Sequence, residues 1–421
     1  MNRICSSLML LLSGIPAGNT VLAQAGSVQT LPMVTIEESS ENRTGFSTWT
    51  ADSLPLNQVI TLAERLLWET PLDVRANAPG ALTTVSARGA GPSRTAVFWK
   101  GVNLQNPMHG VVDISLLPLW AGDAVEIQFG GQSAAKSGGA MGGAVQLTPA
   151  TLPDSVGWTT QFGAGLGSFG NKSGQASLGF SENRLKTQLR AAWQQADNDF
   201  PYRNTALLGQ PVVSQQNNFT KRTDFQHYFQ FAPNEDQTVQ TAIWYQNAFR
   251  EIPPSMTAAP DASWQKDRAL RAVAGWEHKL GQHTQWRHNL AWLDETIAFD
   301  LTGDTDTSRS QTIQFSNEYF KACGDRFSIR ANLTGWWQRA QADGYADSSQ
   351  WFRQYRLAAV FGATYQWHRL EAHAQVRQEW AEGQGAPFTW SVGVRWKLPR
   401  HFFLNLHISR NFNLPTFNDR F

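Results

Sequence analysis

A glycine-rich segment at residues 130–147 holds the residue types that could cradle a phosphate. Its sequence, GGQSAAKSGGAMGGAVQL, has six glycines in the first fourteen positions and a single cation, Lys136. Glycine lets backbone N–H groups approach an anion, and a lysine could reach its charge. A Walker loop needs Gly, four residues and then Gly-Lys-Ser/Thr, whereas Lys136 precedes Gly138 and Gly139. The spacing therefore argues against a nucleotide site and favours a backbone packed tightly on both sides.

The remaining titratable residues give no catalytic pattern. The nine histidines are scattered, and no nucleophile–base signature or paired-acid motif is present, so we expect neither an enzyme nor a cofactor. His283 and His288 flank a turn and a strand, where a solvated or lumen-facing role is favoured over metal ligation. Asp300, Asp304 and Asp306 could offer oxygen ligands to Ca²⁺. A solvated loop is favoured there, because no EF-hand glycine or twelfth-position Glu follows.

Composition points to an apolar or interfacial environment. Aromatic residues make up 12% of the chain, with 18 Trp, while charged residues make up only 16%. A typical soluble domain carries about a quarter charged residues. The formal net charge of +1 argues against a nucleic-acid partner.

Residues 1–25 have the three parts of a secretory signal peptide. Arg3 precedes the apolar run at 8–12, and the segment ends in Ala23-Gln24-Ala25. The apolar run is well short of the ~20 residues that a membrane helix needs. Cys5 would leave with the signal peptide, so Cys323 would be the one cysteine of the mature chain and no intramolecular disulfide is expected.

The next part of the chain predicts a small mixed domain. A helix that stops before Pro71 is indicated by apolar residues at helical spacing. These residues are Leu56, Val59, Ile60, Ala63, Leu66 and Leu67. Short strands separated by glycine-rich turns are predicted at 82–87, 95–99, 124–129 and 144–147.

From about Trp158 the sequence alternates between apolar and polar residues. In the segment RLKTQLRAAWQQ (184–195), Leu189 and Trp193 share one face and Arg190 the other. Tight polar turns are predicted near 181–183, 233–237, 280–283, 322–325, 366–368 and 398–401. They alternate with longer loops near 196–221, 250–265, 300–309, 341–350 and 382–387. Short turns at one end and long loops at the other are typical of an outer-membrane β-barrel and not of a soluble sandwich.

The count of segments is about thirteen strands, an odd number for this class of barrel. The last segment, NFNLPTFNDRF, contains Pro415 and is predicted to be an outward loop, with Phe421 not closing a strand. The sequence therefore predicts an antiparallel transmembrane β-barrel with about 13 of an expected 22 strands, C-terminally incomplete, and an N-terminal α+β domain.

Three segments resemble the plug domain of TonB-dependent outer-membrane receptors. They are Ala87-Arg88-Gly89, FWKGVNLQNPMHGVVDISLLP (98–118) and DAVEIQFGGQSAAKSGGAMGGAVQL (123–147). DFPYRNT (199–205) and RNFNLPTFND (410–419) resemble barrel loops of the Bacteroidetes-type cobalamin-receptor-like group. Many members of the superfamily carry Arg-Gly-Pro where this chain has Gln128-Phe129-Gly130-Gly131, so an Arg-centred plug lock does not carry over.

The resemblance implies a domain order and a location in the outer membrane. The expected parts are a signal peptide (1–25), a periplasmic tail (26–44), a plug (45–150) and a partial barrel (151–421). It also implies that 130–147 leads toward the first barrel strand and is squeezed between the plug and the inner barrel wall, where glycine removes a clashing side chain.

The resemblance also implies a function, which is energised import of a large scarce nutrient. Cobalamin or a related corrinoid is the expected ligand, with a siderophore or haem receptor as the alternative. A passive porin or adhesin is the alternative of another class, but a porin needs an open lumen. Outer-membrane lipid and the energy-transducing protein TonB are the expected partners. The β-prone run Met33-Val34-Thr35-Ile36 would pair edge to edge with TonB as a TonB box.

A ligand descending from outside would meet two apices of the plug, at 77–82 and 104–109. Their small, amide and apolar side chains suit a large neutral-to-amphipathic ligand better than a highly anionic one. The expected ligand-binding residues are Asn77, Pro79, Gly80, Ala81, Leu82, Leu104, Gln105, Asn106, Met108 and His109.

Overall fold

A computed structural model of the chain describes residues 47–50 (backbone only), 60–76, 81–130, 140–150, 152, 155–258, 262–301, 303–399 and 402–421. The predicted signal peptide, the run Met33–Ile36 and Lys136 lie outside the described residues, as do Asn77, Pro79 and Gly80. Residues 41–421 belong to one compact unit.

The N-terminal part of this unit forms one α-helix and three small sheets. Its elements are β1 (Ser47–Thr50), β2 (Ile60–Thr61), α1 (Leu62–Glu69), β3 (Asp73–Ala76), β4 (Thr83–Ser86), the 3-10 turn η2 (Pro92–Arg94), β5 (Thr95–Trp99), β6 (Val102–Asn103), the 3-10 turn η3 (Ile114–Leu116), β7 (Pro118–Leu119), β8 (Ala124–Phe129) and β9 (Gly143–Thr148). The main sheet has the order β1-β8-β9-β5-β6, in which only β5 and β9 are parallel. Strand β2 pairs with β7, and β3 pairs with β4.

Helix α1 begins later than the apolar spacing predicted. The sequence indicated a helix from Leu56, but Ile60 and Thr61 form strand β2, and residues 51–59 lie outside the described residues. A capping box fixes the start. The Thr61 hydroxyl accepts from the Glu64 amide at 3.2 Å, and the Glu64 carboxylate accepts from the Thr61 amide at 2.6 Å. Ile60 and Thr61 therefore belong to a strand that leads directly into the helix.

Gly142 and Gly143 of the 130–147 segment pack against their own domain and not against the barrel wall. A Cβ on Gly142 would lie 2.6 Å from the Ala87 carbonyl oxygen, and one on Gly143 would lie 2.7 Å from the Gln128 carbonyl oxygen. Both oxygens belong to the N-terminal domain. Close packing was thus predicted correctly for these two positions, but the predicted contact partner was wrong, because β9 lies inside the sheet between β8 and β5.

Thirteen long strands form the main path of the second sheet. They are β10 (Gly157–Leu166), β11 (Lys172–Glu182), β12 (Leu185–Ala196), β15 (Thr220–Asn234), β16 (Gln237–Glu251), β17 (Trp264–Lys279), β18 (Thr284–Leu301), β19 (Asp304–Cys323), β20 (Phe327–Ala342), β21 (Phe352–Trp367), β22 (Leu370–Ala381), β24 (Thr389–Lys397) and β25 (Phe403–Arg410). Consecutive strands pair antiparallel, and the short β23 (Gln384–Gly385) pairs with β22. Among the described residues β10 pairs only with β11 and β25 only with β24, so the barrel sheet is open.

The barrel sheet has its apolar side chains outward and its polar side chains inward. Leu189 is 54% exposed, whereas its neighbour Arg190 is 3% exposed. The same inversion recurs along the sheet, with exposed Leu290 and Phe361 and buried Gln314 and Arg377. An apolar exterior with a polar interior is the pattern of a transmembrane β-barrel, and it confirms the predicted fold class. No helix in the described part of the chain is long and apolar enough to cross a bilayer.

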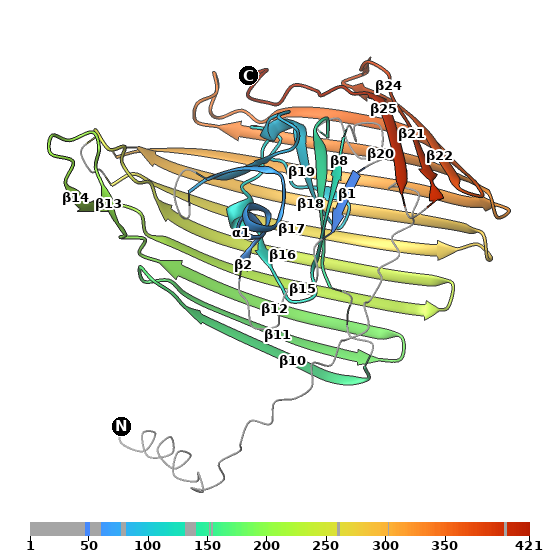
Figure 1. Cartoon of the computed structure of the whole chain (residues 1–421), viewed down its shortest axis with the longest axis horizontal. Coiled ribbons are helices and arrows are strands. Elements are labelled where there is room, and N and C mark those ends of the chain that lie inside the picture. The colour runs from blue at the N-terminus through green and yellow to red at the C-terminus, as the bar shows by residue number, and fades with distance from the viewer. Residues whose placement is uncertain are drawn as a thin grey trace, which may run out of the picture. The chain divides into compact units, whose positions relative to one another are not determined.

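Short and long connections alternate as predicted, with one exception. The predicted long loop at 300–309 is wrong, because Leu301 pairs with Asp304 and the strands β18 and β19 continue through this segment. The longest connection, between β12 and β15, carries the hairpin β13 (Pro201–Arg203) and β14 (Val212–Ser214), which projects at the left in Figure 1.

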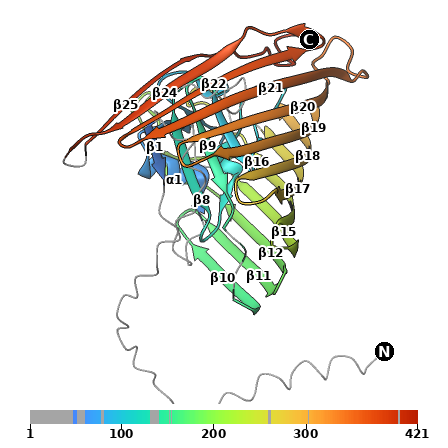
Figure 2. The ribbon, with the colours of Figure 1, turned by 90° about the vertical axis from the view of Figure 1, so that its right-hand side faces the viewer.

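The barrel sheet curves around the N-terminal domain, as Figure 2 shows. The shared apolar core includes Trp99 of β5, which packs against Trp244 of β16 with ring centroids 5.3 Å apart. The N-terminal domain thus lies against the inner face of the strands, where aromatic contact and polar side chains hold it.

Candidate functional site

A cavity of about 570 Å³ lies between the N-terminal domain and the strands β16–β19. Its lining includes Leu82, Leu104, Asn106 and His109 from the N-terminal domain. On the barrel side it reaches Asp343, which begins the long connection between β20 and β21. The cavity therefore lies toward the end of the barrel that carries the longer connections. We call it the outer cavity.

The structure brings residues of both predicted ligand-binding segments to the outer cavity. Leu82 comes from the segment 77–82, and Leu104, Asn106 and His109 come from the segment 104–109. Leu82 is exposed, Ala81 is half-buried, and Leu104 is buried in the core. These placements agree with the predicted geometry, and the ligand-binding roles themselves stay predictions.

Gln105 and Met108 face elsewhere. The Gln105 side-chain amide donates to the carbonyl oxygens of Ser93 and Gly110 at 3.2 and 2.8 Å. Gln105 lines a second cavity of about 230 Å³, the inner cavity, which also includes Asn106. Met108 is buried against Phe417 and lines neither cavity.

Asn106 stands at the boundary of the two cavities. Its side-chain amide donates to the Glu295 carboxylate at 3.1 Å and to the Ser310 hydroxyl at 3.3 Å, so it bridges from the N-terminal domain to β18 and β19. Its oxygen accepts from the Met108 amide at 2.8 Å. The bridge fixes the tip of the 104–109 segment against the barrel wall.

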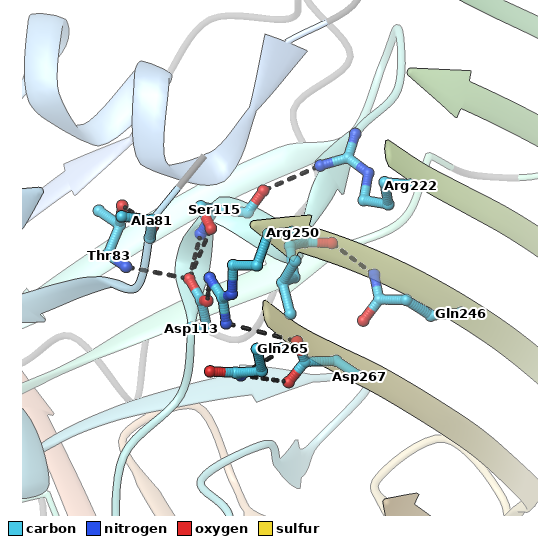
Figure 3. Close-up of polar contacts among 10 residues, drawn as sticks. Ala81, Thr83, Asp113, Ser115, Arg222, Gln246, Arg250, Gln265 and Asp267 are labelled. Carbon is cyan, nitrogen blue, oxygen red and sulfur yellow. Dashed lines mark hydrogen bonds and ion pairs between the residues drawn. The ribbon is translucent and has the colours of Figure 1, made fainter. Parts of the chain in front are cut away.

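Asp113 organises the wall of the outer cavity from the N-terminal domain (Figure 3). One of its oxygens accepts from the Thr83 amide at 3.1 Å and from the Ser115 amide and hydroxyl at 3.0 and 2.6 Å. The other lies 2.6 Å from the Arg250 guanidinium of β16, which also approaches Asp267 of β17 at 3.4 Å. Asp113 thus caps η3, holds the strand that follows the 77–82 segment and pairs with the barrel.

A second buried ion pair joins the N-terminal domain to β12. Asp123 lies 2.9 Å from Arg190, and both side chains are almost fully buried. Asp123 also accepts from the amides of Trp120 and Ala150 at 3.1 and 2.8 Å. The Arg190 guanidinium lies over the ring of Tyr228, 4.9 Å from its centroid. Acids of the N-terminal domain and arginines of the barrel therefore make both contacts.

Sequence reasoning missed these two pairs. Arg190 was assigned correctly to the polar face of its strand, and the order Asp113-Ile114-Ser115 is a local capping signal. Neither signal identifies a partner, because Asp113 and Arg250 lie 137 positions apart along the chain.

The charges of the outer cavity are mixed with an excess of carboxylates. Its acidic lining residues are Asp113, Asp267, Glu295, Asp306 and Asp343, and its arginines are Arg250, Arg268 and Arg271. Arg271 pairs with Glu295 at 2.9 Å. His109 is exposed in the cavity, but partial desolvation by the surrounding residues lowers its pKa, opposed by the charge of Glu295, so the imidazole is neutral near pH 7. A highly anionic solute would therefore meet a formally negative lining.

Residues for which the sequence disfavoured metal binding have other contacts. His288 stacks on Trp276 and Trp286, with ring centroids 5.1 and 5.7 Å away. Asp300 accepts from the Gly303 amide and the Thr305 hydroxyl across the β18–β19 turn. Within the described ranges, no group of three or more His, Cys, Asp or Glu residues could hold a metal ion.

Comparison with known families places the N-terminal domain. Residues 40–144 match the TonB-dependent Receptor Plug Domain family. We therefore call this N-terminal domain the plug. The plug comprises the three small sheets and α1, and the barrel wall contacts it through Asp113 and Asp123. Comparison with curated protein sequences gave no match.

Solved structures with the same fold are receptors and transporters by name. The siderophore receptor PirA from Acinetobacter baumannii is 14% identical, with a TM-score of 0.69 over 91% of this chain and 63% of that chain. The copper transporter OprC is 13% identical, with a TM-score of 0.68 over 88% and 65%. The FrpB iron transporter from Neisseria meningitidis (F3-3 variant) is 12% identical, with a TM-score of 0.71 over 87% and 64%. The chain thus shares the fold of these structures and spans somewhat less than two thirds of their length.

Proposed function

We propose that this chain takes up a large neutral-to-amphipathic solute by TonB-dependent transport across the outer membrane. The observation that supports the proposal is the outer cavity, where both plug segments meet the barrel wall at the end with the longer connections. Its volume of about 570 Å³ lies within the range of solute pockets in proteins. The lining combines apolar Leu82 and Leu104 with the amide of Asn106 and the imidazole of His109.

The charge of the lining supports a corrinoid as the solute. Five acidic residues and three arginines border the outer cavity, and the plug contributes Asp113 as its only acid there. A neutral corrinoid would contact this surface without the repulsion that a polyanionic chelate would meet. The charge of the lining therefore agrees with the cobalamin-receptor-like group that the barrel loops resemble.

A siderophore or another iron chelate is the second candidate. It is favoured by the solved structures of the same fold, which include receptors named for siderophores and ferric enterobactin and a transporter named for ferric citrate. Uncharged chelates would fit the outer cavity better than anionic ones for the reason given above.

Titration of the full chain in detergent micelles separates these candidates. The probes are cyanocobalamin, a neutral ferric trihydroxamate and a trianionic ferric tricatecholate, each followed by quenching of tryptophan fluorescence. We expect cyanocobalamin to bind most tightly, with a Kd of about 1 μM or lower, equivalent to about 8 kcal/mol. Tightest binding of the hydroxamate would assign the chain to siderophores. Tightest binding of the tricatecholate would refute the charge argument, and no binding of any probe would refute the proposal.

The proposed coupling to TonB rests on Met33–Ile36, which we propose as the TonB box. Strand addition depends on main-chain hydrogen bonds, and proline removes one backbone donor. We therefore expect Val34→Pro to abolish energy-dependent uptake of the bound probe in cells while its Kd at the outer face stays unchanged.

Val34→Thr is the matched control, because it keeps the backbone N–H and the β-branched shape. We expect it to import at nearly the native rate. Normal import by Val34→Pro would show that the segment is only a linker.

A further inference from the structure

Residues 415–421 lie across the tip of the plug segment 104–109. Phe417 is 1% exposed and packs with Met108 and Ala340. The amides of Phe417 and Asn418 donate to the carbonyl oxygens of Pro107 and Met108 at 3.1 and 3.2 Å. These bonds and the buried ring hold Asn418 at a fixed position beside His109.

A chain of side-chain contacts ends on one nitrogen of His109. The Tyr345 hydroxyl donates to Oδ1 of Asn418 at 2.7 Å. Nδ2 of Asn418 lies 3.1 Å from Nδ1 of His109. An amide nitrogen can only donate, so Nδ1 of the imidazole must accept. A neutral imidazole that accepts at Nδ1 carries its hydrogen on Nε2.

The orientation of the Asn418 amide follows from Tyr345. Over the described part of the chain, Asn418 is the hydrogen-bond partner of the Tyr345 hydroxyl. In this orientation the Tyr345 hydroxyl donates to the amide oxygen and the amide nitrogen faces Nδ1 of His109; the opposite orientation would require the hydroxyl to accept from the amide and to turn its hydrogen to solvent. Burial raises the pKa of Tyr345 to about 12, so the hydroxyl keeps its hydrogen.

Nε2 of His109 is the ring nitrogen available to a solute. His109 lines the outer cavity and is exposed there, while Nδ1 is occupied by Asn418. Nε2 makes no hydrogen bond to any other described residue. It carries either a hydrogen, which an oxygen of the solute could accept, or a lone pair, which a metal ion could bind, and the tautomer decides which.

We propose that Asn418 and Tyr345 are positioning residues that fix His109 as its Nε2–H tautomer, so that the outer cavity offers a hydrogen-bond donor to an acceptor oxygen of the solute. The recognised group is an uncharged carbonyl oxygen, such as that of an amide or a hydroxamate. A bare metal ion is not held by this imidazole in that tautomer, because Nε2 has no free lone pair. This inference rests on the proposed function, which makes the outer cavity the place where the solute binds. It adds that His109 is the hydrogen-bond donor in one contact with that solute.

Nitrogen-15 NMR of the full chain with labelled histidine, in detergent micelles, measures the tautomer directly. The His109→Gln variant identifies the two signals of His109. We expect Nε2 to be protonated and Nδ1 to be unprotonated at pH 7.5. Asn418→Asp replaces the donor by a carboxylate, which accepts from Nδ1–H, so the two signals should exchange their protonation. Tyr345→Phe releases the amide, so a mixture of both tautomers should appear.

The same variants are titrated with cyanocobalamin. We expect Asn418→Asp to raise the Kd about tenfold, because the hydrogen bond from His109 to the solute is lost. Tyr345→Phe should raise the Kd about threefold, because that hydrogen bond is lost in only part of the molecules. His109→Leu removes the imidazole donor altogether and should also raise the Kd about tenfold. Asn411→Asp adds the same charge outside the 415–421 segment, where the Asn411 amide donates to the Ser409 hydroxyl at 2.9 Å, so it should leave the Kd unchanged.

The NMR signals and the titrations test different parts of the proposal. A hydrogen on Nδ1 in the native chain would overturn the inference whether or not any solute binds. An inverted tautomer in Asn418→Asp with a native Kd for cyanocobalamin would overturn the donor role of His109. Failure of cyanocobalamin and both chelates to bind the native chain would instead refute the proposed function. It would leave the tautomer assignment to be judged by the NMR signals.

Discussion

Replacement of Asp123 by alanine is expected to lower the free energy of plug opening by about 3–5 kcal/mol. This is the usual result of removing one partner from a buried ion pair. Arg190 would keep its charge at 3% exposure without a carboxylate. The amides of Trp120 and Ala150 would also lose their acceptor. The loss of stability would be larger because the cation Lys100 lies near Arg190. Burial and the charge of Arg190 already lower the pKa of Lys100.

Urea-dependent proteolysis of the full chain in micelles measures this change as the free energy of plug opening. Asp123→Asn keeps an acceptor oxygen but no charge, so it should cost less than alanine. Glu277→Ala is the matched control, because the side chains of the Arg287–Glu277 pair at 3.2 Å are 46% and 30% exposed and so reach solvent. Its cost should be below about 1 kcal/mol. An equal effect of Asp123→Ala and Glu277→Ala would show that the buried pair does not hold the plug.

The architecture of the barrel could be predicted because one physical rule governs every strand. Each strand has lipid on one face and the lumen on the other, so apolar and polar residues alternate along the whole sheet. Leu189 and Arg190 illustrate the rule, since their exposures are 54% and 3%. The turns near 183 and 235 were predicted correctly for the same reason, because a polar break between two alternating runs leaves few other structures.

The prediction at 300–309 failed where this rule no longer applies. Strands β18 and β19 have 18 and 20 residues, whereas about 9–11 residues span a bilayer. Beyond the membrane both faces of a hairpin are wet, so the polar run from Asp304 to Arg309 could still pair. Polarity alone therefore indicated a loop in a segment that backbone hydrogen bonding keeps as a hairpin.

The candidate site could be predicted only in part. The segments 77–82 and 104–109 were predicted as plug apices, and Leu82 and His109 do line one cavity. Met108 could not be placed, because its cover is Phe417, more than 300 positions later in the sequence. The partners of Asp113 and Asp123 were missed for the same reason. Pairing between domains depends on register and curvature, which a single sequence does not display.

The second large effect is expected at Asp113, whose two oxygens perform different tasks. One oxygen accepts from Thr83 and Ser115 and so fixes the plug backbone, while the other pairs with Arg250 of the barrel at 2.6 Å. Asp113→Ala removes both and leaves Arg250 buried beside Asp267 alone. We expect the free energy of plug opening to fall by about 3 kcal/mol or more. Amide exchange at 81–87 should quicken by about a hundredfold.

Asp113→Asn separates the two tasks, because the amide oxygen can still accept from Thr83 and Ser115 while the charge is gone. Amide exchange at 81–87 should then stay slow. The free energy of plug opening should still be reduced, since Arg250 has lost its main partner. Arg250→Met is the complementary variant, which leaves the Asp113 cap in place but removes the cation. If Asp113→Asn restored both measurements to native values, the contact with Arg250 would contribute nothing. If Asp113→Asn and Asp113→Ala both exposed 81–87, the carboxylate charge and not the acceptor geometry would be what orders this wall of the outer cavity.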